Sequence, residues 1–171
     1  MPGWALQDSP AAEAVEYFNV KFHRGLKDDV PLYEEIPSTA SDEAWEALWN
    51  VSYLMVPKDK ASQMVNSTWE LTENNKGNSL LSLDVFHQLH CLDTIRKVAQ
   101  PKYYPDYRVP LKHIRHCTGA IRQALMCFGD ITPIVWRWSE ELGELEQRDD
   151  VLHTCRDFGK IMDWAKKHRA E

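Results

Sequence analysis

A ten-residue pattern occurs twice in this chain and constrains its fold more than any other feature. The pattern His-x-x-His-Cys-x-x-x-Ile-Arg begins at His87 and again at His113, 26 residues later. A partial third copy, His-Thr-Cys-Arg-Asp, begins at His153. Two histidines three residues apart on a helix have Cβ atoms about 5–6 Å apart, so both imidazoles reach one metal ion. The duplicated pattern therefore predicts two helices built around a metal.

Hydrophobic periodicity around both copies supports these helices, which we expect over residues 80–100 and 111–128. Prolines at positions 101, 105 and 110 exclude one continuous helix, so the two copies form a helix pair. We also expect helices over residues 42–50 and 151–168. Strands or extended segments are expected over 51–56 and 131–138. Near the N-terminus, the pattern allows either a strand over 15–22 or a helix over 11–18.

This pattern of elements predicts a mainly α fold, with a small single-domain helical core, a helix pair that carries the histidines, and short strands. Four prolines interrupt residues 1–40, which we expect to form an extended N-terminal arm. Residues 41–171 are then the metal-binding catalytic domain, and 171 residues suffice for one such domain.

Charge and hydropathy limit the classes of partner. The formal net charge of −6 argues against nucleic acid, which requires a basic surface. No apolar run of about 18 residues is present, so we expect no membrane span and a soluble chain. The first eight residues lack a basic segment followed by an apolar one, so we do not expect them to be a signal peptide. Two N-glycosylation sequons, at Asn50 and Asn66, favour the lumen of the secretory pathway.

The paired histidines favour copper over other metals. They lie roughly 130–200° from the apolar stripe of each helix, which argues against their being packed core histidines. A di-iron site needs inward carboxylates, and no Glu stands near either pair. Cys91 and Cys117 are each rotated about 100° from the preceding histidine, so a Cys₂His₂ zinc site is poorly supported. An imidazole-rich site suits copper, with nickel and zinc behind it.

The four cysteines, an even number, fit two disulfides in an oxidising compartment. The candidates are Cys91, Cys117, Cys127 and Cys155. If residues 117–127 are one helix, its two cysteines lie about 15 Å apart and cannot be bonded to each other. Two pairings remain open.

The chain resembles the UstYa-like oxidases of fungal secondary-metabolite clusters. The resemblance covers residues 31–166 and includes both His-x-x-His-Cys motifs, the Ile-Arg-Gln-Ala-Leu-Met-Cys run that begins at Ile121, and the His-x-Cys-Arg-Asp-Phe run that begins at His153. An upstream Ile-Pro-Ser segment at Ile36, followed by Asp42 and Trp45, is also similar.

This resemblance implies a copper-dependent enzyme with one or two copper ions, which uses O₂ to oxidise C–H bonds of a small metabolite or peptide precursor. The reactions known in such proteins are cyclisation, desaturation, hydroxylation and halogenation. The implied copper ligands, which are also the implied catalytic residues, are His87, His90, His113, His116 and, as a fifth, His153. The resemblance further implies an N-terminal membrane anchor with a lumenal domain, and it allows a homo-oligomer or a hetero-oligomer with a related protein.

Two other functions fit the same residues. One is a non-catalytic domain in which zinc clamps the two helices, and the other is a metal-independent catalyst whose histidines act as acid and base. Candidate pocket walls are Tyr103, Tyr104, Trp136 and Trp138. Arg96 and Arg122 occupy equivalent repeat positions, and we expect them to brace the helices through Asp130 or Asp157.

Overall fold

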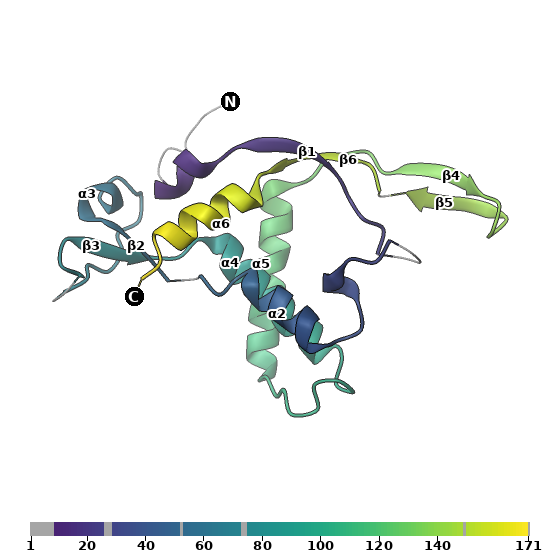
Figure 1. Ribbon diagram of the computed structural model, residues 1–171, viewed down its shortest axis with the longest axis horizontal. Helices are drawn as coiled ribbons and strands as arrows, with labels where there is room; N and C mark the ends of the chain where they lie inside the picture. Colours follow the sequence, from purple (N-terminus) through teal and green to yellow (C-terminus); the bar gives the residue numbers. More distant parts are fainter. Residues whose placement is uncertain (1–8, 26–28, 52, 73–74, 149, 171) are drawn as a thin grey trace. The chain divides into compact units, whose positions relative to one another are not determined.

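The computed structural model describes residues 9–25, 29–51, 53–72, 75–148 and 150–170 (Figure 1). These residues form two compact units that interleave along the chain. Unit 1 contains the described parts of Met1–Tyr17, Leu48–His87 and Arg156–Glu171. Unit 2 contains the described parts of Phe18–Ala47 and Gln88–Cys155.

The prediction of a mainly α fold is wrong, because the structure is a mixture of helices and small sheets, 42% helical and 19% strand. The described residues contain the helices η1 (Pro10–Ala14), η2 (Leu32–Glu34), α2 (Thr39–Ala47), α3 (Lys58–Ala61), α4 (Asp84–Val98), α5 (Leu111–Phe128) and α6 (Phe158–Lys167). Their strands are β1 (Tyr17–Lys21), β2 (Leu54–Pro57), β3 (Asn78–Leu81), β4 (Val135–Ser139), β5 (Glu144–Arg148) and β6 (Leu152–Arg156). These strands form three two-stranded sheets, β1 with β6, β2 with β3 and β4 with β5. The β2–β3 and β4–β5 pairs are antiparallel.

Unit 1 has a small apolar core between the β2–β3 pair and helix α6. Strand pairing sets Leu54 opposite Leu81 and Met55 opposite Leu80, so the residues at the start of the predicted helix over 80–100 belong to a strand instead. Phe86 is fully buried and meets the Phe158 ring edge-on at 6.2 Å. The other core residues are Ala11, Val51, Leu54, Val56, Ala61, Met162, Trp164 and Ala165.

The last predicted helix begins later than expected. We expected it to start at Val151, but residues 152–156 form β6, which lies beside β1 (Figure 1). Helix α6 starts at Phe158 because the Asp157 side chain accepts a hydrogen bond from the Lys160 backbone N–H at 3.2 Å, which is an N-cap. His153 therefore lies on a strand and not in the first turn of a helix.

Unit 2 contains α5 with the bounds that the sequence predicted. The helix starts after Pro110 and stops at Gly129, whose φ of 25° departs from the helix and whose N–H bonds the Leu125 carbonyl at 2.9 Å. The antiparallel β4–β5 hairpin sets Trp136 opposite Gln147 and Trp138 opposite Leu145. Helix α4 enters this unit at Gln88 and is one continuous helix through the boundary.

Candidate metal centre

Three of the predicted copper ligands lie close together in unit 2, on α4 and α5. The ring centroids of His90 and His113 are 6.4 Å apart, and those of His113 and His116 are 6.1 Å apart. His113 and His116 share one face because they are three residues apart near the start of α5. His90 is half-buried, whereas both α5 histidines are exposed, so this group of imidazoles is open to solvent on its α5 side.

Cys91 joins this group, contrary to the expectation from its rotation relative to His90. Its side chain is fully buried, and its sulfur lies within 4.8 Å of a ring nitrogen of His116. On α4 the sulfur also lies within 4.8 Å of a ring nitrogen of His87, one helical turn earlier. Cys91 is rotated about 100° from His90 around the helix, but the i, i+4 spacing from His87 gives a rotation of only about 40°.

The other three cysteines differ in burial. Cys117 is fully buried on α5, Cys127 is exposed near the end of the same helix, and Cys155 is half-buried on β6. Because α5 is continuous, Cys117 and Cys127 are separated by about 15 Å and cannot be bonded. The structure records no disulfide among these four described cysteines. The two disulfides therefore stay a prediction.

His153 is held by a different set of contacts. Its side chain is buried on β6, with the residue 8% exposed, and its ring stacks on Phe22 with centroids 3.6 Å apart and planes 10° apart. Its Nδ1 lies 2.8 Å from Oδ2 of Asp130. Its Nε2 is buried without a hydrogen-bond partner. His153 does not belong to the three-ligand group found among the described residues.

Asp130 accepts hydrogen bonds from both sides. Hydrogen bonds from the hydroxyl and the backbone N–H of Thr132 lower the pKa of Asp130 most, and the bond from His153 adds to them, so that the pKa lies at about 2. The backbone N–H of Thr132 donates to Oδ1 at 2.8 Å. The carboxylate is therefore ionised at neutral pH.

Arg96 lies at the centre of a polar network in unit 2 that the sequence did not predict. Its guanidinium donates to Oδ1 of Asp93 at 2.9 Å and to Oδ1 of Asp42 at 2.6 Å. It also donates to the hydroxyl of Tyr104 at 2.7 Å, and this hydroxyl donates to Asp42 at 2.6 Å. Lys97 Nζ lies 3.0 Å from Oδ2 of the buried Asp93.

Neither repeat arginine has the partner that we expected. Arg96 does brace unit 2, but through Asp42 and Asp93 and not through Asp130 or Asp157. Arg122 is exposed, and its guanidinium contacts the sulfur of Met126, one turn along α5, at 2.9 Å. The two copies of the pattern therefore differ in structure at their last residue.

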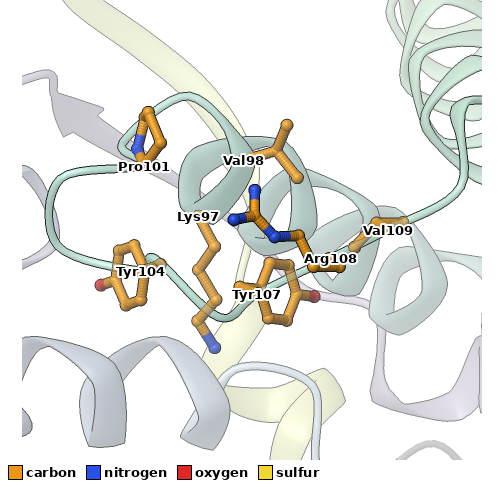
Figure 2. A pocket seen from close by; sticks show the side chains of 7 residues that line it. All are labelled: Lys97, Val98, Pro101, Tyr104, Tyr107, Arg108 and Val109. Carbon is orange, nitrogen blue, oxygen red and sulfur yellow. The ribbon is translucent and has the colours of Figure 1, made fainter.

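Two hollows lie beside the C-terminal end of α4. The smaller, about 230 Å³, is lined by Tyr104 with Lys97, Val98, Pro101, Tyr107, Arg108 and Val109 (Figure 2). The larger, about 480 Å³, is mainly apolar and is lined in part by Tyr103, Tyr33, Trp45 and Leu92. Two of the four predicted pocket aromatics thus line hollows, whereas Trp136 and Trp138 are exposed on β4.

Comparison with known proteins agrees with the duplicated motifs. A family described as "Mycotoxin biosynthesis protein UstYa" matches residues 5–168. The chain belongs to the UstYa family. Among curated relatives, it is 33% identical over 150 residues to the UstYa family oxidase phomYc of Diaporthe leptostromiformis, which covers 78% of this chain and 57% of the relative.

Two other relatives are named for different activities, one as an oxidase and one as a transacylase. The chain is 35% identical over 91 residues to the UstYa family oxidase VicYc of Bipolaris victoriae, with 52% of this chain and 91% of the relative covered. It is 27% identical over 183 residues to the transacylase cctO of Talaromyces islandicus, with 95% of this chain and 60% of the relative covered.

The match to these relatives covers only part of their length. The chain spans about half the length of the first curated relatives that it matches. No solved structure matches it. Within the described part of the chain, no helix is long and apolar enough to cross a membrane.

Proposed function

We propose that this chain is the copper-binding part of an oxidase that acts on C–H bonds of a fungal secondary metabolite or peptide precursor with O₂. The observation that carries this proposal is the gathering of His90, His113 and His116 from two helices, with adjacent ring centroids 6.1–6.4 Å apart. Family membership supports it, since several relatives are named oxidases. Cyclisation, desaturation, hydroxylation and halogenation are all oxidations of this class.

The residues present fit copper. His87, His90, His113 and His116 would supply imidazole nitrogens, which suit copper. Copper, when bound, supplies the one-electron and O₂ chemistry that side chains lack. The half-buried His90 would hold the ion from α4, and the exposed His113 and His116 leave that side open to a substrate.

Zinc is the second candidate, and the position of Cys91 favours it. The buried thiol of Cys91 lies within 4.8 Å of an imidazole nitrogen, and cysteine and histidine together are usual ligands of structural zinc sites. In that case the metal would clamp α4 to α5 and raise stability without redox turnover.

Secretory-pathway localisation belongs to the same proposal. Asn50 and Asn66, the acceptors of the two sequons, are both exposed, as glycosylation requires. Ser52, which completes the first sequon, lies outside the described residues. An oxidising lumen would also permit the two disulfides.

Metal analysis of the purified protein tests the proposal. After reconstitution with copper or zinc, we expect the wild type to retain copper with a copper(II) EPR signal, and the His90→Ala/His116→Ala double variant to lose most of it. Helix content should stay the same, and His23→Ala should behave as the wild type because that exposed imidazole pairs with Asp29 at 2.7 Å.

Three results would contradict the copper assignment. Full copper occupancy in the double variant would remove these histidines from the site. Exclusive retention of zinc, with higher stability and no redox activity, would favour the structural alternative. Acyl transfer without O₂ consumption would place the chain with its relative that is named a transacylase.

A further inference from the structure

A basic segment of unit 2 connects the two helices that carry the histidines and continues into the first turns of α5. Against one acidic residue, Asp106, residues 102–115 contain four basic ones, Lys102, Arg108, Lys112 and Arg115. The chain as a whole has a net charge of −6, so this segment has the opposite sign. The first turn of α5 has no acidic residue that would neutralise the positive end of the helix. A positive region of this kind attracts anions.

Arg108 carries its charge to the smaller of the two hollows. Its side chain lines this hollow of about 230 Å³ together with Lys97, Val98 and Tyr107 (Figure 2). The charge of Lys97 is compensated, because its Nζ lies 3.0 Å from Oδ2 of Asp93. By contrast, the guanidinium of Arg108 forms no ion pair or hydrogen bond with another described residue. Arg108 is therefore the uncompensated cation among the residues that line this hollow.

The hollow lies on the histidine side of α4. Lys97 follows His90 by seven residues, which places it about 10 Å along the helix and rotates it by only about 20°. The hydroxyl of Tyr107 lies 3.4 Å from Oγ1 of Thr94, one turn after His90. On the side of α5, Arg108 precedes His113 by five residues. A ligand held in this hollow therefore lies one to two helical turns from the imidazoles, about 6–10 Å along α4.

The larger hollow faces a different side of α4. It is lined by Leu92 and Ile95, which are rotated about 200° and 140° from His90. A ligand in the larger hollow would have the helix between itself and His90. The smaller hollow is thus the one from which a bound group can extend to the histidines without passing around α4.

We propose that Arg108 binds a carboxylate of the substrate in the smaller hollow and so determines which part of the substrate reaches the histidines. The planar guanidinium matches a carboxylate with two parallel hydrogen bonds. Val98, Pro101 and Val109 offer apolar contacts to the group that carries the carboxylate. The hollow is smaller than the pockets of about 300–1,000 Å³ that enclose drug-sized ligands, so it fits one residue-sized group.

The identity of this ligand as the substrate rests on the proposed function, because it assumes a metal at the histidines. An extended residue spans about 3.3–3.6 Å. The oxidised bond should therefore lie two to three residue lengths from the carboxylate. A solvated surface arginine without a ligand would show no preference between an acid and its neutral amide.

The experiment measures binding of N-acetylphenylalanine and of its neutral amide to the metal-free protein by NMR titration. The wild type should bind the acid about tenfold more tightly than the amide, because a carboxylate makes charge-assisted hydrogen bonds. Arg108→Gln should remove this preference, and Arg108→Lys, which keeps the charge but not the planar fork, should retain part of it. Arg115→Gln is the matched control, because it removes the same charge from the same segment at an exposed residue that does not line the hollow.

Several results would overturn the inference. Equal affinity of the wild type for acid and amide would do so, as would the same loss of preference in Arg108→Gln and Arg115→Gln. Tighter binding of inorganic phosphate than of the acid would contradict the carboxylate. None of these measurements uses copper. A preference for the acid in a protein that binds no copper would refute the proposed function and leave the carboxylate site standing, whereas copper binding without this preference would refute only the role of Arg108.

Discussion

Replacing Arg96 by alanine removes the one side chain that links Asp93, Asp42 and Tyr104 in unit 2. The guanidinium has three hydrogen bonds to these groups, of 2.6–2.9 Å, and its side chain is only 10% exposed. The side chain of Asp93 is 3% exposed, so the substitution leaves a buried carboxylate without its main partner. Removing one member of a buried ion pair typically costs about 3–5 kcal/mol.

We expect the lower end of this range for Arg96→Ala. Lys97 Nζ stays 3.0 Å from the other oxygen of Asp93 and compensates part of its charge. The loss of about 3 kcal/mol corresponds to about 6–12 °C in the melting temperature of a chain of this length. Loss of the contacts between the guanidinium and the rings of Trp45 and Tyr104, both within 5.3 Å, adds to the effect.

Urea denaturation of the metal-free protein, followed by circular dichroism, measures this change. Arg122→Ala is the matched control, because Arg122 occupies the same place in the second repeat but is exposed and contacts only the Met126 sulfur among the contacts described above. A surface substitution of this kind changes stability by less than about 0.5 kcal/mol. Equal destabilisation by the two substitutions would refute the reasoning.

The remaining predictions concern the thiols and acid stability. Two disulfides should form in protein from its own host, so mass spectrometry without reduction should find no free thiol and no Cys117–Cys127 link; four alkylated cysteines would contradict this. Burial raises the pKa of Asp42, but hydrogen bonds from Tyr104 and Arg96 outweigh it and hold the pKa below the usual 3.8. Ionised Asp42 therefore stabilises the fold above about pH 4, and this stability is lost as the pH falls through the lowered pKa. Acid unfolding should be less steep in Asp42→Asn, and an unchanged acid limb would show that the pair contributes nothing.

Several parts of the fold were predictable because their signals are local. Proline before the first turn and glycine after the last mark the two ends of α5, and its predicted bounds are confirmed. Extended segments were also predicted near β2 and β4 and, as one of two alternatives, near β1, but β5 had no comparable signal. Strand β5 has the sequence Glu-Leu-Glu-Gln-Arg, whose residues do not favour strands, and it is extended because it pairs with β4.

In the candidate site, too, some contacts follow from local spacing and others depend on distant segments. Helical spacing was enough to bring His113 and His116 onto one face. The i, i+4 relation of His87 to Cys91 is likewise a local feature of the sequence. The partners of Arg96 could not be found from local spacing alone. Asp93 lies one turn away, but Asp42 is 54 residues distant and comes from a different helix.

The sequence by itself determined the helix pair, the histidines that it carries and the family, because periodicity, prolines and motif spacing act over a few residues. Only the tertiary structure decided that His153 lies on a strand, that Asp130 holds its Nδ1 from 23 residues away, and that Phe22 stacks on its ring. These contacts depend on which strands pair and where a chain segment returns. Such pairings are set by burial and hydrogen bonding between distant segments, and no local pattern records them.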